Sequence, residues 1–184
     1  MSVQTRTQLQ TSAATITNET AAGANTAARV GGLFDDLADS ATLDRERGVA
    51  NLYLDESKNF TPTQGQAVKL TTPLKSGLLT TYNFTRTTTA ITYTGTTSAA
   101  LRVSASMVFS QGNGNQIIIY IAKNGTIIPQ SMTDIITGHN NGHSVTLEAI
   151  LQGAVNDEFT IYINAVNDGG AITISALSFT VHTL

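Results

Sequence analysis

An Asn-Gly pair between two runs of β-branched residues constrains the fold of this 184-residue chain more than any other feature. The pair is Asn124-Gly125, and it joins residues 116–123 to residues 126–128, both of which are rich in isoleucine. Asn-Gly favours a two-residue type I′ turn, because that turn requires a positive φ angle at both central positions. The segment therefore predicts a β-hairpin.

The first strand of this hairpin is apolar on both faces. Three isoleucines at 117, 119 and 121 alternate with a second set made of Ile118, Tyr120 and Ala122. A strand in an antiparallel sheet normally buries one face and leaves the other polar. One set would line the core of a sandwich, so the second set needs another cover.

A neighbouring subunit is the simplest cover for the second apolar face, and a helix or loop of the same chain is the alternative. We predict a subunit contact through Ile118, Tyr120 and Tyr162, with Phe179 added on the parity of its strand.

Turn-forming residues separate about eight strand-like segments in the second part of the chain. The segments are residues 78–84, 87–94, 100–109, 116–123, 126–132, 143–151, 158–166 and 172–181. Pro129 predicts that its strand lies at an edge or stops there. A change of alternation around Ser175-Ala176 predicts a β-bulge in the last strand. Strands at this spacing predict a mainly β fold, a sandwich or jelly roll, after residue 77.

The first part of the chain predicts short helices instead. Val30, Leu33, Phe34 and Leu37 recur at i, i+3, i+4 and i+7, the spacing of one helix face. Helices this short are marginal in water, so the apolar stripe needs a partner. We therefore expect three parts: a helical anchoring or oligomerisation segment at 1–54, a linker or neck at 55–76, and the β-domain at 77–184.

Composition argues against several classes of protein. Charged residues make up only 12% of the chain and form no basic patch, so nucleic-acid binding is not expected. There is no cysteine, which excludes disulfides and thiolate metal sites. The longest apolar run, residues 117–122, is too short to span a bilayer, and the N-terminus has no apolar stretch typical of a secretory signal. We expect no membrane partner.

No set of residues predicts catalysis, a cofactor or a metal. His139 and His143 lie four apart in a loop, with Asp134 as the only nearby carboxylate, so a polar loop is favoured over a metal site. Asp157 and Glu158 are adjacent on a strand and therefore point to opposite faces, which does not suit glycoside hydrolysis. A hydrolase that uses either carboxylate is the third option, behind two binding or structural functions.

The β-region, about residues 80–184, resembles the trimeric jelly rolls of the tumour-necrosis-factor (TNF) and complement C1q type. The motifs that carry the resemblance are Ala-Ala-Leu-Arg-Val-Ser-Ala at 99–105, the strand and turn at 117–125, Val-Thr-Leu-Glu-Ala-Ile-Leu at 145–151, and Asn-Asp-Glu-Phe-Thr-Ile-Tyr-Ile at 156–163. The Asn-Asp pair stands where that family usually has Gly-Asp. The closing aromatic-Gly motif of C1q domains and a collagen-like stalk are both missing, which disfavours an animal C1q protein.

The N-terminal part is similar to bacteriophage virion proteins, notably those of phages with Bacteroidetes-type hosts, through residues 5–9 and 19–37. Proteins of this class join a helical virion anchor to a trimeric β-head. The resemblance implies a homotrimeric, non-enzymatic structural protein of a phage virion, assembled in the host cytoplasm: a head fibre, capsid decoration or small tail spike.

On this reading, Val30, Leu33, Phe34 and Leu37 would bind other virion proteins of the capsid or tail. The loops near Asn113, residues 138–142 and residues 167–170 would contact a glycan on the host surface. The alternative function is a soluble trimeric carbohydrate-binding (lectin-like) or ligand-type jelly-roll module.

Overall fold

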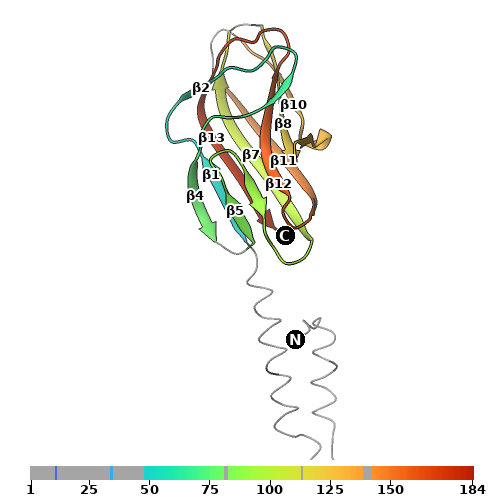
Figure 1. Ribbon diagram of the computed structural model, residues 1–184. Coiled ribbons are helices and arrows are strands. Elements are labelled where there is room, and N and C mark those ends of the chain that lie inside the picture. The colour runs from blue at the N-terminus through green and yellow to red at the C-terminus, as the bar shows by residue number, and fades with distance from the viewer. Residues whose placement is uncertain (1–10, 12–33, 35–47, 81–82, 113, 139–141) are drawn as a thin grey trace, which may run out of the picture. The chain divides into compact units, whose positions relative to one another are not determined.

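A computed structural model describes Thr11, Phe34 and residues 48–80, 83–112, 114–138 and 142–184. The chain divides into two compact units, Met1–Arg47 and Gly48–Leu184. In the first unit, Thr11 and Phe34 are helical, and the Phe34 side chain is exposed. Val30, Leu33 and Leu37 lie outside the described residues, so the anchoring role of this stripe stays a prediction. The second unit is a sandwich of two antiparallel sheets (Figure 1).

The first sheet has the strand order β11-β7-β13-β1-β4, and β2 pairs with β13 beside this path. Its strands are β1 (Val49–Tyr53), β2 (Lys58–Phe60), β4 (Lys75–Thr80), β7 (Ala99–Ser110), β11 (His143–Gly153) and β13 (Ile172–Thr183).

The second sheet has the order β10-β8-β12-β6-β5, while β3 pairs with β12 and β9 pairs with β8. Its strands are β3 (Ala67–Lys69), β5 (Phe84–Arg86), β6 (Ile91–Tyr93), β8 (Gln116–Lys123), β9 (Thr126–Ile127), β10 (Thr133–Ile136) and β12 (Glu158–Ala165), with the 3₁₀ helix η1 (Pro129–Ser131) between β9 and β10.

Alternating apolar residues build the core between the sheets, as the sequence predicts. In β7, every second residue from Leu101 to Phe109 is buried, and Ser104 and Ser106 face the other way. The inward faces of β8 and β12 supply their alternate isoleucines in the same manner. Each fully buried Leu, Ile or Phe contributes on the order of 2 kcal/mol, so this continuous core dominates the stability of the unit.

The predicted hairpin is confirmed. Asn124 and Gly125 have φ angles of 52° and 76°, and Lys123 pairs with Thr126 across the turn. The second strand stops at Ile127, because Pro129 begins η1 and has no N–H to continue the ladder. The edge of β8 is instead closed by Ser131, whose Oγ accepts a hydrogen bond of 2.8 Å from Ile121 N. The short strand β10, which the sequence did not predict, then pairs with β8.

The predicted neck at 55–76 is wrong, and so are the limits of its neighbours at 54 and 77. The β-unit begins at Gly48, and β1, β2, β3 and the start of β4 lie within the two sheets. Leu52, Phe60 and Leu70 are buried in the common core. The strands β2 and β3 have only three residues each and pair with the distant strands β13 and β12. Because strands of three residues contain too little alternation, the sequence does not distinguish β2 and β3 from a linker.

The sandwich has two ends with different contents. At the proximal end the chain enters β1, and Thr183 N donates a hydrogen bond of 3.1 Å to Gly48 O. The β8–β9 and β11–β12 turns lie at this end, next to the C-terminus, which Figure 1 marks. The distal end carries the loops after β7 and β12, where β7 finishes and β13 starts. These two ends and one sheet face hold the candidate interaction sites.

Candidate interaction surfaces

Large apolar side chains gather on the outer face of the second sheet. Tyr120 on β8 lies directly opposite Tyr162 on β12, and Ile118 lies opposite Asn164. All three predicted contact residues on this face are partly exposed. On the neighbouring β10 side, Ile136 is 73% exposed and Met132, just before β10, is 55% exposed. We call Ile118, Tyr120, Met132, Ile136 and Tyr162 the outer patch.

The fourth predicted contact residue, Phe179, does not belong to this patch. Its side chain is fully buried in the core between the sheets. The predicted bulge explains the error, because β13 shifts register between Ile174 and Ala176. After the shift, Leu177, Phe179 and Val181 point inward. The alternation of Ile172 and Ile174 therefore does not predict which way the residues after the bulge face.

Two polar atoms on β12 lie beneath this outer face without a hydrogen-bond partner among the described residues. They are Thr160 Oγ1 and Asn164 Oδ1, and they stand two residues before and two residues after Tyr162. Buried polar atoms are normally paired, and each unpaired one costs about 1–3 kcal/mol. The outer face therefore combines partly exposed aromatic rings with buried polar atoms whose hydrogen-bonding capacity is unused.

The distal end brings together loops that the sequence predicted as contact loops. Gln111 Nε2 donates to Gly170 O at 3.0 Å, and Asn115 Nδ2 donates to Asp168 Oδ2 at 3.2 Å. The loop at 137–138 joins them, since Gly114 N donates to Thr137 O at 2.7 Å. We call these loops, with Gln64, the distal loop cluster; Gln64 Nε2 donates to Asn167 O at 2.8 Å. Asn113 and residues 139–141 lie outside the described residues.

The histidine pair gives no metal site among the described residues. His143 Nε2 accepts a hydrogen bond of 3.2 Å from Gly138 N, and its ring packs on Phe109 at a centroid distance of 5.8 Å. Across the part of the chain that the structure describes, no three His, Cys, Asp or Glu side chains gather to hold an ion. His139 lies outside that part, so the absence of a metal remains a prediction.

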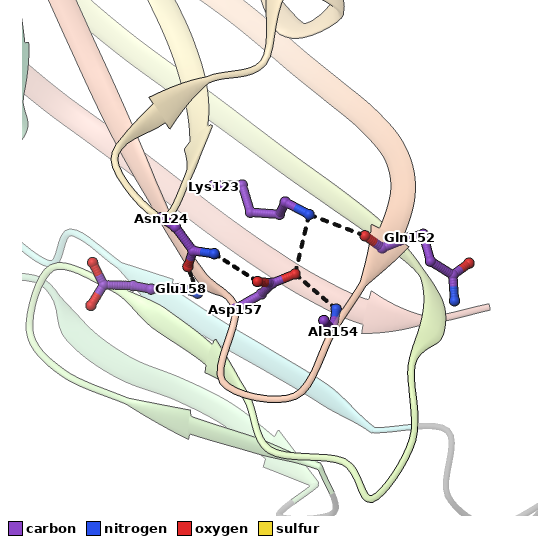
Figure 2. A network of polar contacts seen from close by, with 6 residues as sticks. All are labelled: Lys123, Asn124, Gln152, Ala154, Asp157 and Glu158. Atoms are coloured by element: carbon purple, nitrogen blue, oxygen red, sulfur yellow. Dashed lines mark hydrogen bonds and ion pairs between the residues drawn. The ribbon is translucent and has the colours of Figure 1, made fainter.

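At the proximal end, the Asp157 carboxylate joins two turns (Figure 2). Its Oδ1 accepts a hydrogen bond of 2.7 Å from Asn124 Nδ2, and its Oδ2 accepts one of 2.7 Å from Ala154 N. Lys123 Nζ lies 3.2 Å from the same Oδ2 and donates to Gln152 O at 3.4 Å. Asn124 Oδ1 accepts a hydrogen bond of 2.8 Å from Glu158 N. We call this arrangement the Asp157 clasp.

The clasp keeps Asp157 ionised. Burial of the carboxyl favours its neutral form, but the hydrogen bonds from Ala154, Asn124 and Lys123, with the lysine charge, outweigh burial and lower the pKa of Asp157. Glu158 points elsewhere and forms an ion pair with Lys69, with Nζ and Oε1 3.0 Å apart. The two adjacent carboxylates therefore have separate partners. Asp157 holds two turns together, which does not favour the hydrolase option.

No protein-family profile and no curated sequence matches the chain. Among solved structures, murine APRIL aligns with 75% of this chain and 99% of its own, at 9% identity and a TM-score of 0.52. The globular domain of zebrafish complement 1qA covers 75% of this chain and 97% of its own, at 12% identity and a TM-score of 0.50.

The vertex protein P5 of phage PRD1 is similar as well. It aligns with 75% of this chain and 73% of its own, at 10% identity and a TM-score of 0.52. At these identities the likeness shows the fold, which is a jelly-roll sandwich of the TNF and C1q type. Among the described residues, no helix has the length and apolar character needed to cross a membrane.

Proposed function

We propose that this chain is a non-enzymatic structural protein of a phage virion, placed as a head fibre, capsid decoration or small tail spike. The observation that carries the proposal is the jelly-roll fold of residues 48–184, which is similar to that of a phage vertex protein. The N-terminal segment that precedes it in the chain resembles virion proteins. The two ends of the sandwich support this role. The chain enters β1 at the proximal end, and the distal loop cluster lies at the other end of the sandwich.

The head is a homotrimer in this proposal, and the outer patch forms its subunit contact. Support comes from Ile118, Tyr120 and Tyr162, which share one sheet face with the exposed Ile136 and Met132. Gln116 and Asp134 lie on the same face and bond to each other, so the patch combines apolar and polar side chains, as protein–protein contacts do. The test is the solution mass of Tyr120→Asp and Ile136→Asp variants by light scattering. Monomeric variants would support a subunit contact through the outer patch. Variants that stay trimeric would show that the subunits contact each other through another face.

The N-terminal segment anchors the head to capsid or tail proteins through Val30, Leu33, Phe34 and Leu37. The test uses a variant that lacks residues 1–47, since the β-unit starts at Gly48. Particles assembled with this variant should lack the head, while the isolated head stays folded. Normal incorporation of the truncated protein into particles would contradict the anchor.

The distal loop cluster contacts a glycan on the host surface. The amide-rich loops and the exposed Asp168 favour hydrogen bonds to sugar hydroxyls. The second candidate function, a soluble lectin-like or ligand-type module, rests on the likeness of the fold to APRIL and the complement 1qA domain. A glycan array distinguishes the two when combined with particle fractionation. Saturable sugar binding by a protein that never cofractionates with particles would favour the second candidate.

A further inference from the structure

The tip of the β8–β9 hairpin carries the dipeptide most susceptible to spontaneous deamidation. Gly125 has no side chain to hinder its backbone nitrogen, which can attack Cγ of the preceding Asn124. In that reaction a C–N bond forms, Nδ2 leaves as ammonia, and a five-membered imide closes. Water then opens the imide and yields aspartate or isoaspartate at position 124. The only co-reactant is water, and nothing is oxidised or reduced.

The folded hairpin holds the Asn124 amide at both of its polar atoms. Its Nδ2 donates to Asp157 Oδ1 at 2.7 Å, and its Oδ1 accepts from Glu158 N at 2.8 Å (Figure 2). The backbone is also fixed, because Asn124 N donates to Glu158 O at 2.8 Å and the residue has a φ angle of 52°. Asn124 is solvent-exposed, so exclusion of water does not shield it. Conformational restraint is the remaining protection.

We propose that Asn124 is a modification site gated by the Asp157 clasp, and that deamidation there proceeds only after the clasp has opened. The side chain must release both Asp157 and Glu158 before Cγ can approach Gly125 N. Once the reaction is complete, a carboxylate replaces the amide that donated to Asp157. The new carboxylate at position 124 then faces the carboxylate of Asp157, where Asn124 Nδ2 had donated a hydrogen bond to Asp157 Oδ1. Repulsion between the two negative charges prevents the clasp from closing again. The inference is independent of the proposed virion role.

The first experiment measures conversion of Asn124 in the full-length protein. Folded and urea-unfolded samples are incubated in the same mildly alkaline buffer, and peptide mapping by mass spectrometry follows position 124. We expect the folded protein to react at least roughly tenfold more slowly, because a hydrogen bond to a charged group must first open. The Asn113-Gly114 and Asn141-Gly142 pairs provide references of the same dipeptide in urea. Equal rates at Asn124 in folded and unfolded protein would overturn the proposal.

The second experiment opens the clasp by substitution. Asp157→Ala removes the acceptor of Asn124 Nδ2, and Asp157→Asn retains an acceptor oxygen without the charge. Conversion at 124 should be fastest in Asp157→Ala, intermediate in Asp157→Asn and slowest in the wild type, at a temperature where circular dichroism shows each protein folded. If Asp157→Ala does not fold, Asp157→Asn alone decides. A wild-type rate in the folded variant would contradict gating by the clasp.

The third experiment tests the consequence of the product. Asn124→Asp mimics it, and Asn124→Gly is the matched control, because glycine accepts the positive φ angle and removes the side-chain bonds without adding charge. We expect a lower Tm for Asn124→Asp than for Asn124→Gly at neutral pH, and a smaller gap in acid, where the carboxylates become protonated. Equal Tm values at neutral pH would refute the clash between carboxylates.

Discussion

The proximal and distal ends of the sandwich use the same kinds of residue for different purposes. Both are built from Asn, Asp and Gly turns. At the proximal end, Asp157 is buried and bonded to the Asn124 and Ala154 donors of two turns. At the distal end, Asp168 is exposed, and the Oε1 atom of the buried Gln111 has no partner among the described residues. The buried carboxylate fixes strand connections, whereas the exposed carboxylate of Asp168 lies where a ligand can reach it, although it also accepts bonds from Asn115 and Gly170.

Removing the carboxylate of Asp157 or of Asp168 is the strongest test of this difference between the two ends. Asp157→Ala should lower the free energy of unfolding by about 2–4 kcal/mol, because it leaves the Asn124 and Ala154 donors without their acceptor and removes the ion-pair partner of Lys123. The matched distal variant, Asp168→Ala, should cost less than about 1 kcal/mol, since Asp168 is exposed. Urea unfolding at neutral pH measures both. Equal losses would show that the two ends do not differ in the proposed way.

Acid should weaken the Asp157 clasp. The folded-state pKa of Asp157 lies below its ordinary value of 3.8, so the folded protein binds this proton less readily than the unfolded chain. The stabilisation is therefore fully present above pH 3.8 and is lost as the pH falls through the lower folded pKa. Asp157→Asn should cost about 2 kcal/mol at neutral pH and little in strong acid. A difference that does not depend on pH would contradict the ionised clasp.

The distal end has one saturated bond set of its own, centred on Thr137. Its buried hydroxyl donates to Gly112 O and accepts a hydrogen bond of 3.1 Å from Asn115 N. Thr137→Val keeps the shape and should cost about 1–1.5 kcal/mol in urea unfolding. Thr146→Val, at an exposed position on β11, is the control. If both variants unfold alike, Thr137 does not organise the distal loop cluster.

The smallest effect should come from the second ion pair of the proximal region. Lys69 and Glu158 have side chains that are 36% and 41% exposed, so Lys69→Met should change stability by less than about 0.5 kcal/mol. Lys123→Met removes the cationic partner of the buried Asp157 and should cost more, about 1 kcal/mol. Thermal unfolding of the two variants at low salt compares them directly. A larger loss of stability in Lys69→Met than in Lys123→Met would mean that burial of Asp157 does not strengthen its ion pair with Lys123.

What the sequence could predict depended on whether the signal was local. Asn124-Gly125 carries its own turn geometry, so the hairpin and the alternating strands around it were predictable. The strands β2 and β3 are defined by their partners on β13 and β12, and no pattern within three residues contains that information. Phe179 shows the same limit, because alternation predicts a bulge in β13 but does not fix the residue at which the later side chains change face.

Residues of the candidate sites were likewise predictable where the signal was local and were missed where it depended on distant parts of the chain. The outward facing of Ile118, Tyr120 and Tyr162 was predictable because each lies on a regular strand, while their role in a subunit contact stays a prediction. Ile136 was missed because β10 is short and follows η1. The Asp157 clasp was missed because its members are far apart in the chain and only the β11–β12 turn brings them to the hairpin.

The position of β1 also has a mechanical consequence. This strand follows the proximal Gly48 directly and lies between β13 and β4 in the first sheet. A pulling force applied at Gly48 and resisted at the distal loops acts along the axis of β1. The hydrogen bonds to both neighbouring strands are then loaded together in shear, rather than broken one at a time as in peeling. A head that tethers two bodies through these two ends would therefore resist tension best in the direction in which the tether is pulled.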